Sequence, residues 1–150
     1  MNPIRIFTYT DTENGQAFAY TLDWFKQFKL ESEEDVTDVY GEAGGQWHSV
    51  SLKPMTAATD RDVKRAARIP DSERGFILDE TELPAARASL CVAEWSFPQP
   101  VTKEGYNALP VAVAALIDAN ICQRLYGGAA DPFFLNYLKN RQPTSEAKPA

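Results

Sequence analysis

Residues 91–121, CVAEWSFPQPVTKEGYNALPVAVAALIDANI, decide the fold of this chain. They predict an apolar helix that stops, an extended turn that contains Pro98 and Pro100, and a second apolar helix. Each proline favours extended geometry in the residue before it, so the turn is expected to be stiff. Thr102 is placed to cap a short helical turn, and Pro110 suits the start of the next helix. The stretch therefore predicts two apolar helices held at a fixed angle, with no reactive side chain between them.

The sequence before this stretch predicts a small antiparallel sheet. Residues 4–9 alternate in the manner of a strand, and residues 17–21 are expected to return as its partner after an Asn-Gly turn. Residues 22–28 carry apolar side chains at a spacing of three, which suggests one or two helical turns docked on that hairpin. Residues 47–52 predict a further strand.

The rest of the chain predicts helices. Four are expected, at about residues 59–69 (beginning at 59 or 60), 81–95, 109–126 and 131–138. Residues 71–80 are predicted to form a loop between the first two. The side chains expected in the core are Leu90, Trp95, Leu116, Ile117 and Ile121.

Together these elements predict the α+β class, with an N-terminal β-hairpin or small antiparallel sheet followed by a helical part of about four helices. Residues 1–141 are expected to form a single domain, and residues 142–150 a flexible C-terminal tail. The chain has 150 residues, of which 44% are hydrophobic and 11% aromatic, and this composition argues against general disorder.

Charge and cysteine content narrow the class of protein. A formal charge of −6 disfavours nonspecific binding to nucleic acid or to anionic membranes. No run of about 20 apolar residues suits a membrane span, and the N-terminus lacks the pattern of a secretory signal. Cys91 and Cys122 lie in apolar helical patterns and are expected to be buried thiols in a reducing compartment, a packed disulfide being the alternative.

The residues that could carry chemistry are few. His48 is the only histidine, so this chain alone cannot form a two-histidine zinc site. A Ser-His-Asp triad would have to use His48, yet no GxSxG sequence accompanies it. Cys91, Cys122 and His48 would need a carboxylate to complete a zinc site, and no CxxC pair exists. We therefore predict no catalytic, cofactor-binding or metal-binding residue, with a small hydrolase that uses His48 as an alternative.

Two charged groups and one aromatic segment are candidates for binding a partner. Basic side chains follow one side of the helix predicted from residue 59, and acidic ones follow one another in residues 31–38. Either group is compatible with a solvated surface, and the basic one also with nucleic acid or an acidic protein. Their opposite signs suit head-to-tail contact between subunits. The candidate partner-binding residues are Phe133, Phe134, Tyr137, Arg61, Arg65, Arg68, Glu33, Glu34 and Asp35.

The order of structural residues in this region resembles a known group of proteins. A helix is followed by Trp95-Ser96-Phe97, by PQPVT at residues 98–102, by Glu104, and by Leu109-Pro110 with Val113 opening an apolar helix. The segment VSLKPMT at residues 50–56 matches the strand that leads into a basic helix in the same group. In these features residues 46–126 resemble small tail-assembly, chaperone-like proteins of long-tailed bacteriophages. Gly105 and the aromatic N-terminal segment depart from the pattern.

The resemblance implies a non-enzymatic accessory protein, of phage or prophage origin, that acts by protein–protein binding. Its expected partners are other phage tail proteins, such as the tape measure or tail tube protein, with a homo-oligomer possible. No cofactor, nucleic acid or membrane is expected. The expected location is the host cytoplasm, with the virion as an alternative. One alternative function is a virion-resident structural subunit of the tail or head–tail region that forms a ring.

Overall fold

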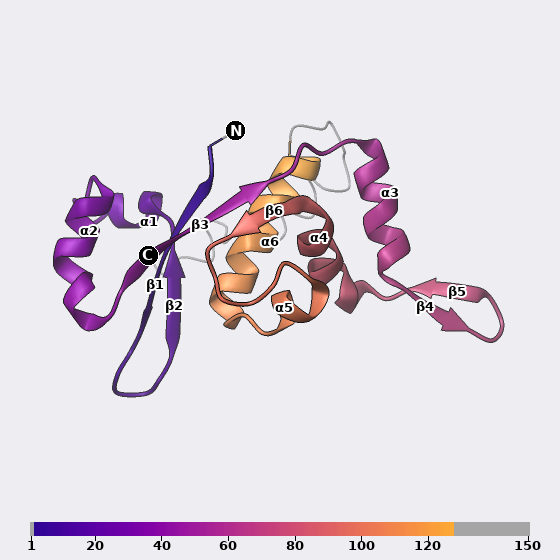
Figure 1. Ribbon diagram of the computed structural model, residues 1–150, viewed down its shortest axis with the longest axis horizontal. Helices are drawn as coiled ribbons and strands as arrows, with labels where there is room; N and C mark the ends of the chain where they lie inside the picture. Colours follow the sequence, from indigo (N-terminus) through magenta and orange to yellow (C-terminus); the bar gives the residue numbers. More distant parts are fainter. Residues whose placement is uncertain (1, 128–150) are drawn as a thin grey trace, which may run out of the picture.

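The computed structural model describes residues 2–127, and a four-stranded antiparallel sheet lies at its centre (Figure 1). The strand order is β2-β1-β3-β6, and every neighbouring pair is antiparallel. The strands are β1 Ile4–Thr10, β2 Ala17–Tyr20, β3 Gln46–Leu52 and β6 Val92–Trp95. The predicted strands at residues 4–9, 17–21 and 47–52 are confirmed.

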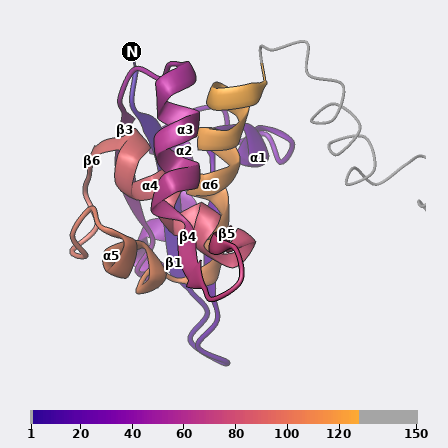
Figure 2. The same cartoon turned by 90° about the vertical axis from the view of Figure 1, so that its right-hand side faces the viewer.

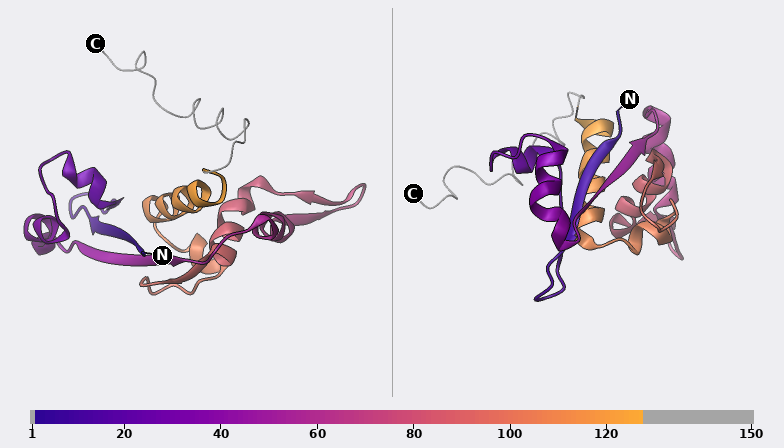
Figure 3. Two further views of the ribbon diagram at one scale, coloured as in Figure 1. Left: turned by 90° about the horizontal axis from the view of Figure 1, so that it is seen from above. Right: turned by 60° about the vertical axis from the view of Figure 1, so that its left-hand side comes forward.

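The two faces of this sheet are both covered. Side chains alternate along a strand, so Ile6 and Phe7 point to opposite faces. Ile6 belongs to the larger apolar cluster, which includes side chains of α4 and α6. Phe7 packs instead with residues of α1 Leu22–Lys26 and α2 Glu33–Tyr40. The sheet therefore lies between two helical layers, which Figure 3 shows from two further sides.

Four α-helices follow the third strand: α3 Ala57–Ala66, α4 Leu83–Cys91, α5 Lys103–Asn107 and α6 Val111–Tyr126. With the sheet they confirm the α+β class. Ile117 and Ile121 of α6 are completely buried, as predicted for the core. The other three predicted core residues, Leu90, Trp95 and Leu116, are half-buried and pack against the same cluster.

The predicted loop at residues 71–80 is wrong. Strands β4 Arg68–Asp71 and β5 Gly75–Leu78 pair there in a separate two-stranded hairpin, followed by a short 3₁₀ helix, η2 Glu80–Glu82. The hairpin projects from the body next to α3 (Figures 1 and 2). Pro70 does stop the preceding helical pattern, but it lies in a two-stranded hairpin, where a residue without an N–H is tolerated.

The predicted helix over residues 81–95 is too long. Helix α4 ends at Cys91, and the next four residues form the edge strand β6. Val50 pairs with Trp95, and Leu52 with Val92, so pairing with β3 outweighs the local helical pattern. The turn that follows therefore joins a strand to a helix, and not two helices.

The starts of two helices bear on the acidic and basic groups. Residues 33–40 form helix α2, which begins with a capping box: the Ser32 hydroxyl accepts from the Asp35 N–H, and the Asp35 carboxylate accepts from the Ser32 N–H. Helix α3 begins earlier than predicted, after Thr56, whose N–H donates to the Thr59 hydroxyl. Residue 59 is thus inside the first turn and does not cap the helix.

The turn at residues 96–102 contains no helix, which confirms the predicted break. The Trp95 indole N–H donates to the Gln99 carbonyl at 2.6 Å, and the Thr102 hydroxyl accepts from the Gly105 N–H at 2.9 Å as the predicted cap of α5. A Cβ built on Gly105 would lie 1.8 Å from the Pro100 carbonyl oxygen. This close approach explains a glycine where a better helix former was expected.

Within residues 2–127 no helix has the length and apolar character needed to cross a membrane. The helix predicted from residue 131, the aromatic residues Phe133, Phe134 and Tyr137, and the boundary between residues 141 and 142 lie outside the described residues.

Candidate functional site

Helix α2 carries the three predicted acidic residues, and within the described residues only one of them has a side chain without an ion pair or hydrogen bond. Glu33 forms an ion pair with Arg5 on β1 at 2.9 Å. Asp35 is occupied by the capping box at the start of the helix. Glu34 is exposed and takes part in no ion pair within the described chain. Glu33 and Asp35 therefore stabilise the fold, and Glu34 is the residue of the three whose carboxylate is available to a partner.

Other carboxylates extend this surface around α2. We call the exposed set the acidic end; it consists of Glu31, Glu34, Asp38 and Glu42. Apolar side chains are exposed beside it: Val39 on α2 is 56% exposed, and Phe28, just after α1, is 59% exposed. The acidic end thus combines negative charge with uncovered apolar surface.

The predicted basic residues lie on α3 and at the start of β4. Arg61, Arg65 and Arg68 are all exposed, and the structure gives them one ion pair, between Arg65 and Asp62 at 3.6 Å. Lys64 lies among them and pairs with Asp60 at 2.9 Å. We call Arg61, Lys64, Arg65 and Arg68 the basic face. It lies at the end of the molecule opposite α2 (Figure 1), so one copy of the chain does not bring the two charged surfaces together.

The β4–β5 hairpin next to the basic face exposes apolar side chains that the sequence analysis missed. Phe76 is 63% exposed, Leu78 41% and Ile69 38%. Pro70 pairs with Phe76 across the hairpin, and Arg68 with Leu78, so these four side chains share one face. We call this hairpin the apolar arm. Its sequence signal is the short apolar run GFIL on one side of a polar turn, with RIPD on the other.

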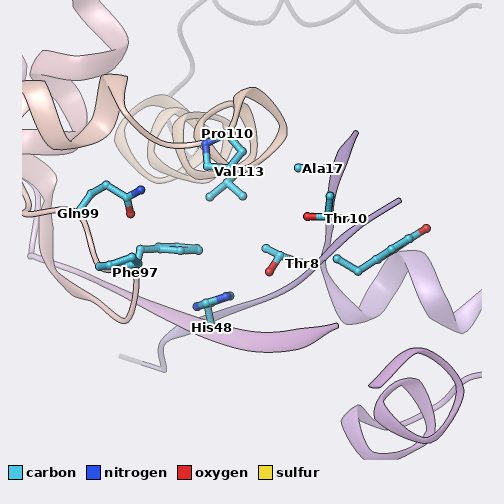
Figure 4. A pocket seen from close by; sticks show the side chains of 10 residues that line it. Thr8, Thr10, Ala17, His48, Phe97, Gln99, Pro110 and Val113 are labelled. Carbon is cyan, nitrogen blue, oxygen red and sulfur yellow. The ribbon is translucent and has the colours of Figure 1, made fainter. Parts of the chain in front are cut away.

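A pocket of about 200 Å³ lies between the sheet, the turn at residues 97–99 and the start of α6 (Figure 4). His48 of β3 stacks on Phe97 with 4.3 Å between ring centroids, and Thr8 and Thr10 of β1 face them. The side-chain oxygen of Gln99 is buried there and has no hydrogen-bond partner among the described residues. The pocket is small and mixed in polarity.

The chemistry of His48 in this pocket is limited. Its Nδ1 lies 3.3 Å from the Ser96 hydroxyl oxygen, which also accepts from the Ser49 N–H at 3.0 Å. Burial, with a smaller effect of Arg5, lowers the pKa of His48, so the ring is neutral near pH 7. No carboxylate within residues 2–127 bonds to this ring. His48 and Ser96 thus have no third group of the kind that orients the histidine in a catalytic triad. Their contacts instead hold the turn against β3.

An ion pair between α4 and α6 lies beside the two cysteines. Arg87 and Asp118 are in contact at 2.8 Å, with only 13% and 20% of their side chains exposed. Burial, then the nearby Asp118, raises the pKa of Cys122 to about 11, and burial also raises the pKa of Cys91. Both thiols are free and protonated near neutral pH, so the alternative disulfide is wrong; Cys91 is buried as predicted, whereas Cys122 is only half-buried. No cluster of three metal-ligating side chains occurs in the part of the chain that the structure describes.

Comparison of the chain with protein-family models, with curated proteins and with solved structures finds no match.

Proposed function

We propose that this chain is a non-enzymatic accessory protein in the assembly of bacteriophage tails, and that it acts by holding another tail protein. The resemblance of residues 46–126 to tail-assembly proteins supports the biological setting. The apolar arm beside the basic face supports the mode of action, and it is the observation on which this proposal rests.

The arm has the properties of a binding surface. A two-stranded hairpin without further packing is only marginally stable in water, and this one leaves Phe76 and Leu78 uncovered. Grouped apolar side chains of this kind mark sites of protein–protein contact. Aromatic anchors supply most of the binding energy at such sites, whereas charges at the rim set the rate and the salt dependence. The arm and the basic face therefore suit an apolar segment of a tail protein that is flanked by acidic residues.

The proposal is tested by recovering tail proteins from a phage-infected lysate with the tagged chain. We expect Phe76→Ser to reduce recovery strongly and Arg65→Glu chiefly to increase its sensitivity to salt. Val111→Ser is the matched control, because Val111 is 85% exposed at the start of α6, away from the arm. Phe134→Ala tests the predicted aromatic segment in the same assay. A wild-type chain that captures no tail protein would contradict the tail-assembly function, and full recovery by Phe76→Ser would contradict the arm.

A second proposal is a virion-resident subunit that forms a ring. The placement of the acidic end and the basic face at opposite ends of the molecule favours it. Stoichiometric presence of the chain in purified particles would support the ring subunit, whereas a chaperone-like protein is expected to be absent from them.

A further inference from the structure

We infer that copies of this chain associate head to tail, with the acidic end of one copy docked on the basic face and apolar arm of the next. This inference stands on the two surfaces themselves and does not require the proposed function. If that function holds, the neighbouring copy and the tail protein compete for the arm.

Charge complementarity indicates that the partner bound at the basic face is a second copy of this chain. The basic face presents Arg61 and Arg68 with no ion pair inside the described chain. The acidic end presents Glu34 and Asp38, which likewise form no ion pair there. The turn of the arm carries Asp71 and Glu73 beside Arg74, and Asp79 and Glu80 follow the arm, so the positive charge without an ion pair lies on α3 and at Arg68. The carboxylates of a second copy are therefore expected to meet the base, near Arg68.

Apolar surface is available on both sides of the proposed contact. Phe76 and Leu78 extend from the basic side, while Phe28 and Val39 are exposed beside the acidic end. Burying such side chains against each other supplies the favourable free energy that exposed charge pairs alone do not. A nucleic acid would use the basic face but leave the apolar arm uncovered, and the chain carries a net charge of −6.

The position of the two surfaces sets the type of assembly. They lie at opposite ends of the long axis, so each copy can bind one neighbour at each end (Figures 1 and 3). A contact between two different surfaces is heterologous, and it produces a ring if the rotation closes and an open chain if it does not. A closed symmetric dimer is not expected from this contact.

The test uses two charge-reversed variants of the full chain, studied by sedimentation at low salt. The first, Arg61→Glu with Arg65→Glu, makes both ends acidic, and the second, Glu34→Lys with Asp38→Lys, makes both ends basic. Each alone is expected to weaken association at least about tenfold, because like charges now face each other. An equimolar mixture restores opposite charges wherever the two variants alternate, and it is expected to recover association.

Two further variants complete the experiment. Phe76→Ser is expected to weaken wild-type association by at least about tenfold, since it removes an apolar anchor. Glu13→Lys with Glu104→Lys makes the same change in net charge at exposed sites away from α2, and it is expected to associate as the wild type does. A wild type that stays monomeric at low salt, a mixture that does not recover, or a control that is equally weakened would each overturn the inference. Association is measured on the purified chain alone and capture of tail proteins is measured in lysate, so the two proposals can fail separately.

Discussion

Two connections in this molecule have similar composition and opposite roles. Residues 96–110 lead from β6 to α6, and the β4–β5 hairpin leads from α3 to α4; both contain proline and glycine. The first is fastened to the body by the Trp95 indole and by Lys103, whose ammonium group donates to the Ala66 carbonyl at 3.0 Å, and the Thr102 cap holds it internally. Within residues 2–127, one backbone hydrogen bond joins the end of the second to the body, from the Asp79 N–H to the Ala67 carbonyl at 2.8 Å.

This difference shows that the proline and glycine content of a connection does not predict whether it stabilises the fold or is exposed for binding. What separates the two is where their polar and apolar groups find partners. The fastened turn places Phe97 against His48 and Tyr106 in the core, whereas the arm leaves Phe76 in solvent. The turn therefore contributes to stability, and the arm is available for binding.

The largest expected effect compares two glycines. Gly105→Ala places a Cβ against the Pro100 carbonyl and is expected to lower the free energy of unfolding by about 3 kcal/mol. Gly75→Ala in the arm has open space around it but a φ of 80°, so a loss of about 1 kcal/mol is expected. Urea denaturation of both variants measures the difference. Equal losses would show that the turn is no more tightly packed than the arm.

A smaller effect is expected from the prolines of the fastened turn. Replacing Pro98 and Pro100 together with Ala should lower the free energy of unfolding by about 1–2 kcal/mol, because the unfolded chain gains freedom. Pro70→Ala in the arm is the single-proline comparison and should lower the free energy of unfolding by about half as much, on the order of 0.5–1 kcal/mol. An equal loss of stability in Pro70→Ala and in the double variant would contradict the proposed difference between the turn and the arm.

A change on the arm itself should leave stability nearly untouched. Phe76→Ser removes a side chain that is 63% exposed, so the free energy of unfolding is expected to stay within about 0.5 kcal/mol of the wild type. Thermal and urea denaturation check this value on the same preparation that is used for binding. A loss of several kcal/mol would mean that the arm is part of the core.

The smallest expected effect is a pH dependence of the fastened turn. The pKa of His48 is lowered in the folded chain, mainly by burial and also by Arg5, whereas in the unfolded chain it lies near 6.5. As the pH falls from about 7 to 5.5, the unfolded state binds a proton that the folded state resists, so stability decreases. His48→Asn should flatten the dependence of the free energy of unfolding in this window, and Phe76→Ser should not. An unchanged slope in His48→Asn would contradict the assigned shift.

The sequence predicted an element correctly where its local pattern and its tertiary packing favour the same structure. The strand at residues 4–9, the apolar face of α6 with Ile117 and Ile121, and the Thr102 cap all follow from spacing or capping preferences, and all are present. Strand β6 was missed because its pairing with β3 involves residues far away in the sequence. The capping box of α2 was readable in Ser32 and Asp35 but was overlooked within an acidic run.

The candidate binding surfaces were predictable only in part. The basic face follows from helical spacing, but the sequence does not show that Glu33 would be engaged by Arg5. The arm was missed because Pro70 was interpreted as the end of a helix and the start of a loop. Pairing of β4 with β5 converts that loop into a projecting surface, and such pairing depends on the turn geometry around Gly75.

The strand order has a consequence for synthesis on the ribosome. The strands β1 and β3, which carry Ile6 and Val50 on one face, are made by residue 52, but α6, which helps to cover that face, is the last described helix to be made. At about 5–20 residues per second, that face lacks its α6 cover for several seconds of translation. Nascent chains that end before α6 are therefore expected to aggregate or to recruit host chaperones, whereas chains that include it can close the core as they emerge.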